Sequence, residues 1–206
     1  MYFLFSLFCV NNVIYMKIFR FLLVLCGTFF ACMGLAGEID GMRFTHIGLE
    51  EGLSHSTIFG INQDKEGNLW FATYDGFNKY DGYNFTVYRH QYKNPKSIAS
   101  DITRCVVIDN DNRIWIGTRE GLSLYNHRKN EFSNFFYKRK GQNVTVRNIV
   151  PMQKDWLMLG TTEGILLFDV KGERFLNDTL SATLHSLKPL TLLRQDDDIF
   201  IGTKGK

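Results

Sequence analysis

Polar and aromatic side chains suited to holding a small polar ligand recur just after apolar runs of this 206-residue chain. Tyr74 offers a ring for stacking, and Arg119 offers a planar fork of donors for paired hydrogen bonds. The candidate ligand-binding residues are His55, Tyr74, Asp75, Ser100, Asp101, Arg119, Glu120, Thr162 and Glu163. Three of them are acids followed by glycine, a pair typical of tight turns, so a purely structural role is the alternative interpretation.

Known catalytic and metal-binding patterns are absent from the sequence. Asp109-x-Asp111 resembles the start of a calcium loop, but Arg113 occupies a ligand position and Ile114 stands where glycine is needed. No nucleophile elbow, phosphate loop or dinucleotide fingerprint occurs. The histidines lack zinc-ligand spacing and are His46, His55, His90, His127 and His185. We therefore predict no catalytic residue, no metal and no cofactor.

Charge and cysteine content are unremarkable. The formal net charge is +3, from 24 basic and 21 acidic residues, so no strong field favours nucleic acid as a partner. The basic cluster at residues 138–140 is predicted to be a solvated turn. Cys105 is the one cysteine beyond residue 36, and its apolar surroundings predict a buried, inert thiol.

A five-residue phrase occurs four times and identifies the elements that carry the candidate residues. Its final threonines are separated by 45, 43 and 42 residues. A period of this length in a strand-rich chain indicates the blades of a β-propeller. The copies are LWFAT at residues 69–73, IWIGT at 114–118, LMLGT at 157–161 and IFIGT at 199–203.

Each of the first three copies lies within a predicted set of four antiparallel strands. The phrase is an apolar run, as expected of a strand covered on both faces. The acid–Gly pair that follows predicts a hairpin turn, because glycine adopts positive φ without steric cost. A strand is expected before each phrase, at residues 58–63, 102–108, 146–152 and 190–193. Further strands are expected after each turn and near Phe85, Phe132 and Phe175. The fold class is therefore all-β.

The run D-x-x-G-N-L-W-F-A-T-x-D-G-F-N-x-Y-D-G at residues 64–82 resembles the two-component regulator propeller repeat. Residues 109–126 resemble it as well, and residues 44–54 resemble the usual opening of the same sensor region, a first strand before a G-L-S segment. The resemblance covers about residues 44–206. It implies the amino-terminal part of the periplasmic sensor region of a Bacteroidetes hybrid two-component histidine kinase, in which two seven-bladed propellers precede membrane-proximal and kinase domains.

The chain is expected to begin with a leader. Residues 1–15 are interpreted as an upstream extension from a misassigned start, and residues 16–36 as a signal peptide. Lys17 and Arg20 precede an apolar core, and small residues end at Ala36. An uncleaved membrane anchor and lipidation of Cys32 are the alternatives. Residues 37–57 are expected to supply a first strand and lead-in, followed by blades at 58–101, 102–145, 146–189 and, in part, 190–206.

These boundaries predict about three and a half blades, an incomplete ring with two uncovered blade faces. We expect the isolated chain to fold poorly or to self-associate, because apolar surface left in water destabilises a small domain. A small propeller assembled from several chains is the alternative. The expected partners are the missing blades and the membrane-proximal domains of the same sensor.

The resemblance also implies a function. The chain is expected to be exported to the periplasm by its cleaved signal peptide, and tethered to the inner membrane in a full-length sensor. It would bind an oligosaccharide and relay the signal to a kinase that is not in this chain, without being an enzyme itself. One alternative is a propeller lyase of the streptogramin-lyase type, which needs a convergent histidine and acid. His55 is the only histidine expected on the candidate face. The other alternative is a protein-interaction scaffold.

Overall fold

The computed structural model describes residues 44–176, 184 and 187–203. The chain divides into two units, residues 1–46 and residues 47–206, and the strands of the described residues lie in the second unit. The predicted upstream extension and signal peptide, at residues 1–15 and 16–36, lie outside the described residues. Within the described ranges, no helix has the length and apolar character needed to cross a membrane.

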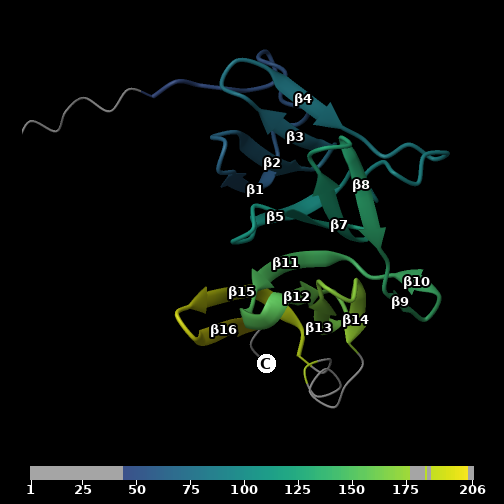
Figure 1. Cartoon of the computed structure of the whole chain (residues 1–206). Coiled ribbons are helices and arrows are strands. Elements are labelled where there is room, and N and C mark those ends of the chain that lie inside the picture. The colour runs from purple at the N-terminus through teal and green to yellow at the C-terminus, as the bar shows by residue number, and fades with distance from the viewer. Residues whose placement is uncertain (1–43, 177–183, 185–186, 204–206) are drawn as a thin grey trace, which may run out of the picture. The chain divides into compact units, whose positions relative to one another are not determined.

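The second unit is built from antiparallel sheets that follow one another along the chain, and the predicted all-β, four-stranded blades are confirmed (Figure 1). The first sheet contains β1 (Ile58–Gln63), β2 (Leu69–Thr73), β3 (Phe77–Tyr80) and β4 (Phe85–Tyr88). The second contains β5 (Thr103–Ile108), β6 (Ile114–Thr118), β7 (Gly121–Asn126) and β8 (Glu131–Phe135). The third contains β11 (Val146–Pro151), β12 (Trp156–Thr161), β13 (Gly164–Asp169) and β14 (Arg174–Leu176).

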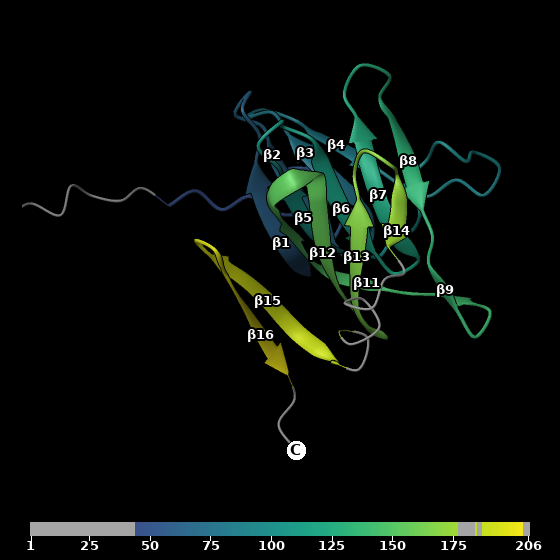
Figure 2. The same cartoon turned by 60° about the horizontal axis from the view of Figure 1, so that its bottom comes forward.

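Three smaller elements complete the described residues. β15 (Pro189–Gln195) and β16 (Asp198–Thr203) form a two-stranded sheet, the start of a fourth blade. β9 (Lys138–Arg139) and β10 (Gln142–Asn143) form a short hairpin between the second and third blades. A 3-10 turn, η1 (Gln153–Asp155), joins β11 to β12. Figures 1 and 2 show the first strands of the blades, β1, β5, β11 and β15, in succession along one side of the sheets, with no closed ring.

Alternate residues of each repeated phrase pack against the preceding and the following blade. Trp70 of β2 lies in one core with Ile114 and Ile116 of β6. Trp115, between these two isoleucines, faces the other way into a second core with β12 and β13. This alternation follows from the two-residue period of a strand, and it explains why the phrase is apolar throughout rather than alternating.

A buried aspartate anchors the tryptophan in the first two blades. The Trp70 indole Nε1–H donates to Asp64 at 2.7 Å, and the Trp115 indole donates to Asp109 at 3.0 Å. Both tryptophans are fully buried, so their N–H groups need an acceptor inside the protein. In the third and fourth blades the strand register places Met152 with Met158 and Gln195 with Phe200 at the corresponding positions. The aspartate is therefore absent where the indole is absent.

The first strand of every blade carries a β-bulge at one and the same position. In each blade, one residue of the first strand pairs with the threonine that ends the phrase. The next residue of the first strand is skipped by the pairing. The skipped residues are Phe59, Arg104, Arg147 and Leu190. A bulge removes a residue from the regular ladder and changes the direction of its side chain.

The lead-in is described only in part. A first strand is predicted within residues 37–57; residues 44–57 contain no strand, and residues 37–43 lie outside the described residues, so the strand stays a prediction. The backbone of the described part is closed by local turn bonds, from Gly52 N to Leu49 O at 3.2 Å and from Leu53 N to Gly48 O at 3.1 Å. A strand requires a neighbouring strand to satisfy its backbone groups, and these groups are satisfied within the turn.

Candidate functional site

The predicted hairpin tips are built by their threonines. Thr73 donates through its hydroxyl to the Gly76 carbonyl at 2.8 Å, and the same oxygen accepts from the Asp75 backbone N–H at 3.3 Å. Gly76 has a φ of 111°, which favours glycine. The tips of the next two blades repeat these bonds with Thr118, Glu120 and Gly121, and with Thr161, Glu163 and Gly164. The acid–Gly pairs are therefore genuine turn formers, and these turn bonds do not use the acidic side chains.

Backbone bonds hold these tips against the segments that enter the first strands. The Arg119 N–H donates to the Ile102 carbonyl at 3.0 Å, and the Gly76 N–H donates to the Asp101 carbonyl at 2.7 Å. The Thr145 hydroxyl donates to the Arg119 carbonyl at 2.9 Å. The hairpin tips and the interblade segments thus lie on one face of the sheets, which we call the tip face.

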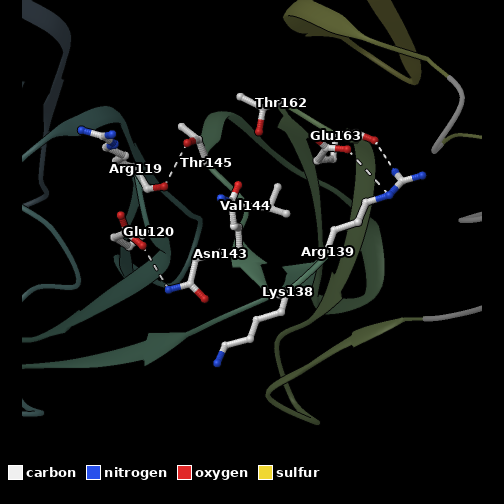
Figure 3. A pocket seen from close by; sticks show the side chains of 11 residues that line it. Arg119, Glu120, Lys138, Arg139, Asn143, Val144, Thr145, Thr162 and Glu163 are labelled. Atoms are coloured by element: carbon white, nitrogen blue, oxygen red, sulfur yellow. Dashed lines mark hydrogen bonds and ion pairs between the residues drawn. The ribbon is translucent and has the colours of Figure 1, made fainter.

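A polar hollow of about 600 Å³ opens on the tip face between the second and third blades (Figure 3). Its walls are the tip of the β6–β7 hairpin, the β9–β10 hairpin and the tip of the β12–β13 hairpin. Its lining residues are Arg119, Glu120, Lys138, Arg139, Gly141, Gln142, Asn143, Val144, Thr145, Thr162 and Glu163. Four predicted site residues are among them.

A second hollow of about 570 Å³ shares Arg119, Glu120 and Asn143 with the first. It extends toward the segment that joins the first blade to the second, and it is lined further by His90, Ala99, Ser100, Asp101, Ile102 and Phe136. The two hollows together contain six of the nine predicted residues.

The charges of the first hollow are unevenly paired. Glu163 accepts a hydrogen bond on its carbonyl from Arg139 at 2.9 Å, and its carboxylate lies 3.7 Å from the same guanidinium. Glu120 accepts from the Asn143 amide at 3.1 Å. Arg119 and Lys138 make no ion pair among the residues that the structure describes. The lining therefore offers free cationic donors beside carboxylates that already have partners.

The remaining three predicted residues lie at the tip of the first blade and line neither hollow. The ring of His55 lies 5.5 Å from that of Tyr74, and Tyr74 is 48% exposed. Asp75 forms an ion pair with Arg89 at 3.0 Å. The structure therefore divides the nine candidates into a group of six and a group of three.

Sequence reasoning missed several lining residues. The basic cluster at 138–140, predicted as a solvated turn, contributes Lys138 and Arg139 to β9, while Lys140 and Gly141 turn the hairpin with positive φ of 51° and 79°. His90 also lines the second hollow, so His55 is not the only histidine on the tip face. The sequence did carry a signal for this hairpin. Gly141 lies in a polar run, and this run is bounded by Tyr137 on one side and Val144 on the other.

Two further groups lie away from the hollows. Ligand atoms of Asp64, Glu66 and His127 lie within 4.8 Å of one another, but Asp64 already accepts bonds from Trp70 and Asn68. We therefore interpret this cluster as structural.

Burial raises the pKa of the Cys105 thiol to about 12, which keeps it protonated at neutral pH.

Comparisons with known proteins point to one kind of protein. The family described as "Two component regulator propeller" matches residues 52–75 and 97–120. A relative named "Histidine kinase P4", from Formosa agariphila, is 37% identical over 70 residues, which is 34% of this chain and 5% of that protein.

Two solved structures extend the similarity beyond the matched repeats. The extracellular domain assigned to a hybrid two component system of B. thetaiotaomicron is 30% identical, with a TM-score of 0.65 over 77% of this chain and 24% of that one. The extracellular domain assigned to a one component system of the same organism is 25% identical, with a TM-score of 0.55 over 74% of this chain and 20% of that one. The chain thus spans a quarter or less of each of these relatives.

Proposed function

From the two-component regulator propeller repeats that this chain carries, we propose that it senses a ligand outside the cytoplasm as part of a two-component signalling system. The ligand binds on the tip face, and a kinase elsewhere in the system receives the signal. The similarity to extracellular domains supports export, with the leader at residues 16–36 as the proposed signal peptide.

The pair of adjoining hollows on the tip face is the observation that carries this proposal. Their lining combines carboxylates, amides, hydroxyls and a guanidinium, the groups that hydrogen-bond the hydroxyls of sugars. We propose an oligosaccharide as the ligand, with Arg119, Glu120 and Asn143 at its centre because they border both hollows. His55, Tyr74 and Asp75 form a separate contact area on the first blade.

Calorimetric titration of the full chain with neutral and acidic oligosaccharides tests the proposal. We expect saturable binding that weakens about tenfold or more in Arg119→Gln, because a charge-assisted hydrogen bond is lost. Arg128→Gln, an exposed substitution in the β7–β8 turn, is the matched control and should bind like the wild type. Binding that is equal in both variants would place the ligand elsewhere.

A propeller lyase remains a second candidate because of His90 and Asp101, which lie together in the second hollow. The His90 backbone N–H donates to the Asp101 carboxylate at 2.6 Å, and the ring Nδ1 lies 2.8 Å from the Ile98 carbonyl. Turnover of a cyclic depsipeptide lactone, followed by mass spectrometry, distinguishes the two functions. Cleavage that disappears in His90→Gln would favour the lyase, and sugar binding without turnover would favour the sensor.

A further inference from the structure

The four bulges of the first strands place one side chain per blade at corresponding positions. The surroundings of the bulge are the same in each blade. A threonine lies opposite the residue before the bulge, and a small residue directly precedes that threonine on its strand. The bulge residues themselves differ, being Phe59, Arg104, Arg147 and Leu190. A recognition surface needs a constant backbone that presents side chains of different kinds, and the repeated bulge with its variable residue has this property.

The bulges lie at the tip face. Ile58, Thr103 and Val146, which directly precede the first three bulges, pair with the threonines that close the hairpin tips. Each bulge residue is therefore one residue away from the level of the tips. This places Arg104 and Arg147 on the same end of the sheets as Arg119 and the two hollows.

The bulge side chains of the first two blades contact each other, and the bulge of the fourth blade is bonded to the third. The Arg104 guanidinium carbon lies 4.5 Å from the ring centre of Phe59, the bulge residue of the preceding blade. The Asn148 amide, next to Arg147, donates to the carbonyl of the bulge residue Leu190 at 3.1 Å. Arg104 and Arg147 are the bulge residues of the adjacent strands β5 and β11.

Neither arginine has a counter-ion among the described residues. No ion pair or hydrogen bond in the described part of the chain uses either guanidinium, and the Arg104 Nε is buried without a partner. Arg147 is exposed. A buried N–H without an acceptor is costly, and two guanidinium groups without counter-ions on adjacent strands attract an anion.

We propose that Arg104 and Arg147 bind an oxyanion, the carboxylate or sulfate ester of an acidic sugar, and so select acidic over neutral ligands. The exposed side chains of Phe59 and Leu190 flank this pair and offer apolar surface to the sugar ring. The inference rests on the proposed ligand-binding tip face, but the anion site itself is testable without any oligosaccharide.

The first experiment titrates the full chain with inorganic sulfate against chloride at constant ionic strength, and with glucuronic acid against glucose, by calorimetry. We expect saturable binding of sulfate and glucuronic acid, weakened about tenfold or more in Arg147→Gln. Because Arg147 is exposed, this variant retains the fold, and circular dichroism checks that it does. Arg147→Lys should recover part of the affinity, and Arg128→Gln, in a turn at the opposite end of the sheets, should bind like the wild type.

The outcomes separate this inference from the proposed function. No saturable response to sulfate beyond that to chloride, or equal affinities in wild type and Arg147→Gln, would overturn the anion site. Sulfate binding lost in Arg147→Gln, with no oligosaccharide bound, would uphold the anion site and contradict the sensing proposal. Oligosaccharide binding that is indifferent to both sulfate and Arg147→Gln would contradict the anion site alone.

Discussion

At the scale of single residues, the buried Asp–Trp hydrogen bond explains why the first two repeats contain both an aspartate and a tryptophan. Asp64 is buried and accepts from Trp70 and Asn68, so one carboxylate closes the turn between β1 and β2 and satisfies the indole N–H. Where Phe200 replaces tryptophan, no indole N–H has to be satisfied, and Gln195 stands in the place of the acid. The motif is thus explained by hydrogen bonding inside the blade and not by ligand binding.

Removing this acceptor should destabilise the chain. Asp64→Ala leaves the buried Trp70 N–H unsatisfied, and we expect the free energy of unfolding to fall by about 1–3 kcal/mol. Asp64→Asn keeps a carbonyl acceptor and should lose less. Urea denaturation followed by tryptophan fluorescence compares the two variants. Equal losses in both would show that the indole bond is not the stabilising contact.

The same carboxylate makes stability depend on pH. Burial raises the pKa of Asp64, but the hydrogen bonds from Trp70 and Asn68 outweigh burial and bring the pKa below its ordinary value of 3.8. A depressed pKa contributes stability above the unfolded-state value, and this contribution disappears as the pH falls through the folded-state value. We expect the stability difference between wild type and Asp64→Asn to shrink below about pH 4. Denaturation curves measured down to about pH 3 check this, and a constant difference would contradict it.

At the scale of elements, the small residue of the phrase sets how closely a blade packs on its neighbour. A Cβ on Gly117 of β6 would lie 2.5 Å from Cys105 Sγ and 2.8 Å from the Val146 carbonyl oxygen of the next blade. In the first blade the small residue stands on the opposite strand instead, because Gly60 pairs with Ala72. Each pair of opposed positions therefore holds at least one residue without a side chain, which keeps the first strands close together.

Filling one of these positions should be costly. Gly117→Ala forces a backbone atom of β11 to move, and we expect a loss of about 1–3 kcal/mol in the free energy of unfolding. Gly60→Ala is the matched control, because its nearest contact would be an ordinary 3.5 Å. Thermal unfolding of both variants decides the question. A tolerated Gly117→Ala would mean that the blades separate more easily than the structure indicates.

At the scale of the whole second unit, the first and last sheets present faces that the middle sheets cover. Ile61 of β1 is 56% exposed, whereas Val106, its counterpart in β5, is buried between two blades. Leu193 of β15 is 60% exposed in the same way. These uncovered faces agree with the expected open ends of the blade series, and apolar surface of this kind favours association.

We therefore expect the isolated chain to self-associate as its concentration rises. Ile61→Ser and Leu193→Ser each remove apolar surface at one open face, and each should raise the dissociation constant about tenfold or more. Tyr92→Ser removes an aromatic side chain that is 93% exposed elsewhere, and it should leave association unchanged. Sedimentation equilibrium measures all three variants. A monomer at every concentration would contradict the prediction.

The sequence by itself determined the strands of the blades, because their signals are local. The phrase at residues 114–118 forms β6 with the same bounds, because the turn residues on either side fix where this apolar strand begins and ends. The acid–Gly pairs likewise became hairpin tips, because positive φ at Gly121 is a property of the residue itself.

Only the tertiary structure decided which side chains meet. The hollow around Arg119 exists because blades 43 to 45 residues apart in the chain lie side by side, and because the β9–β10 hairpin folds back to Glu163. The bulges at Arg104 and Arg147 were equally hidden, since a strand and a bulged strand have the same apolar pattern. Their effect appears only when neighbouring blades are placed, because contacts between distant segments depend on packing and not on local propensity.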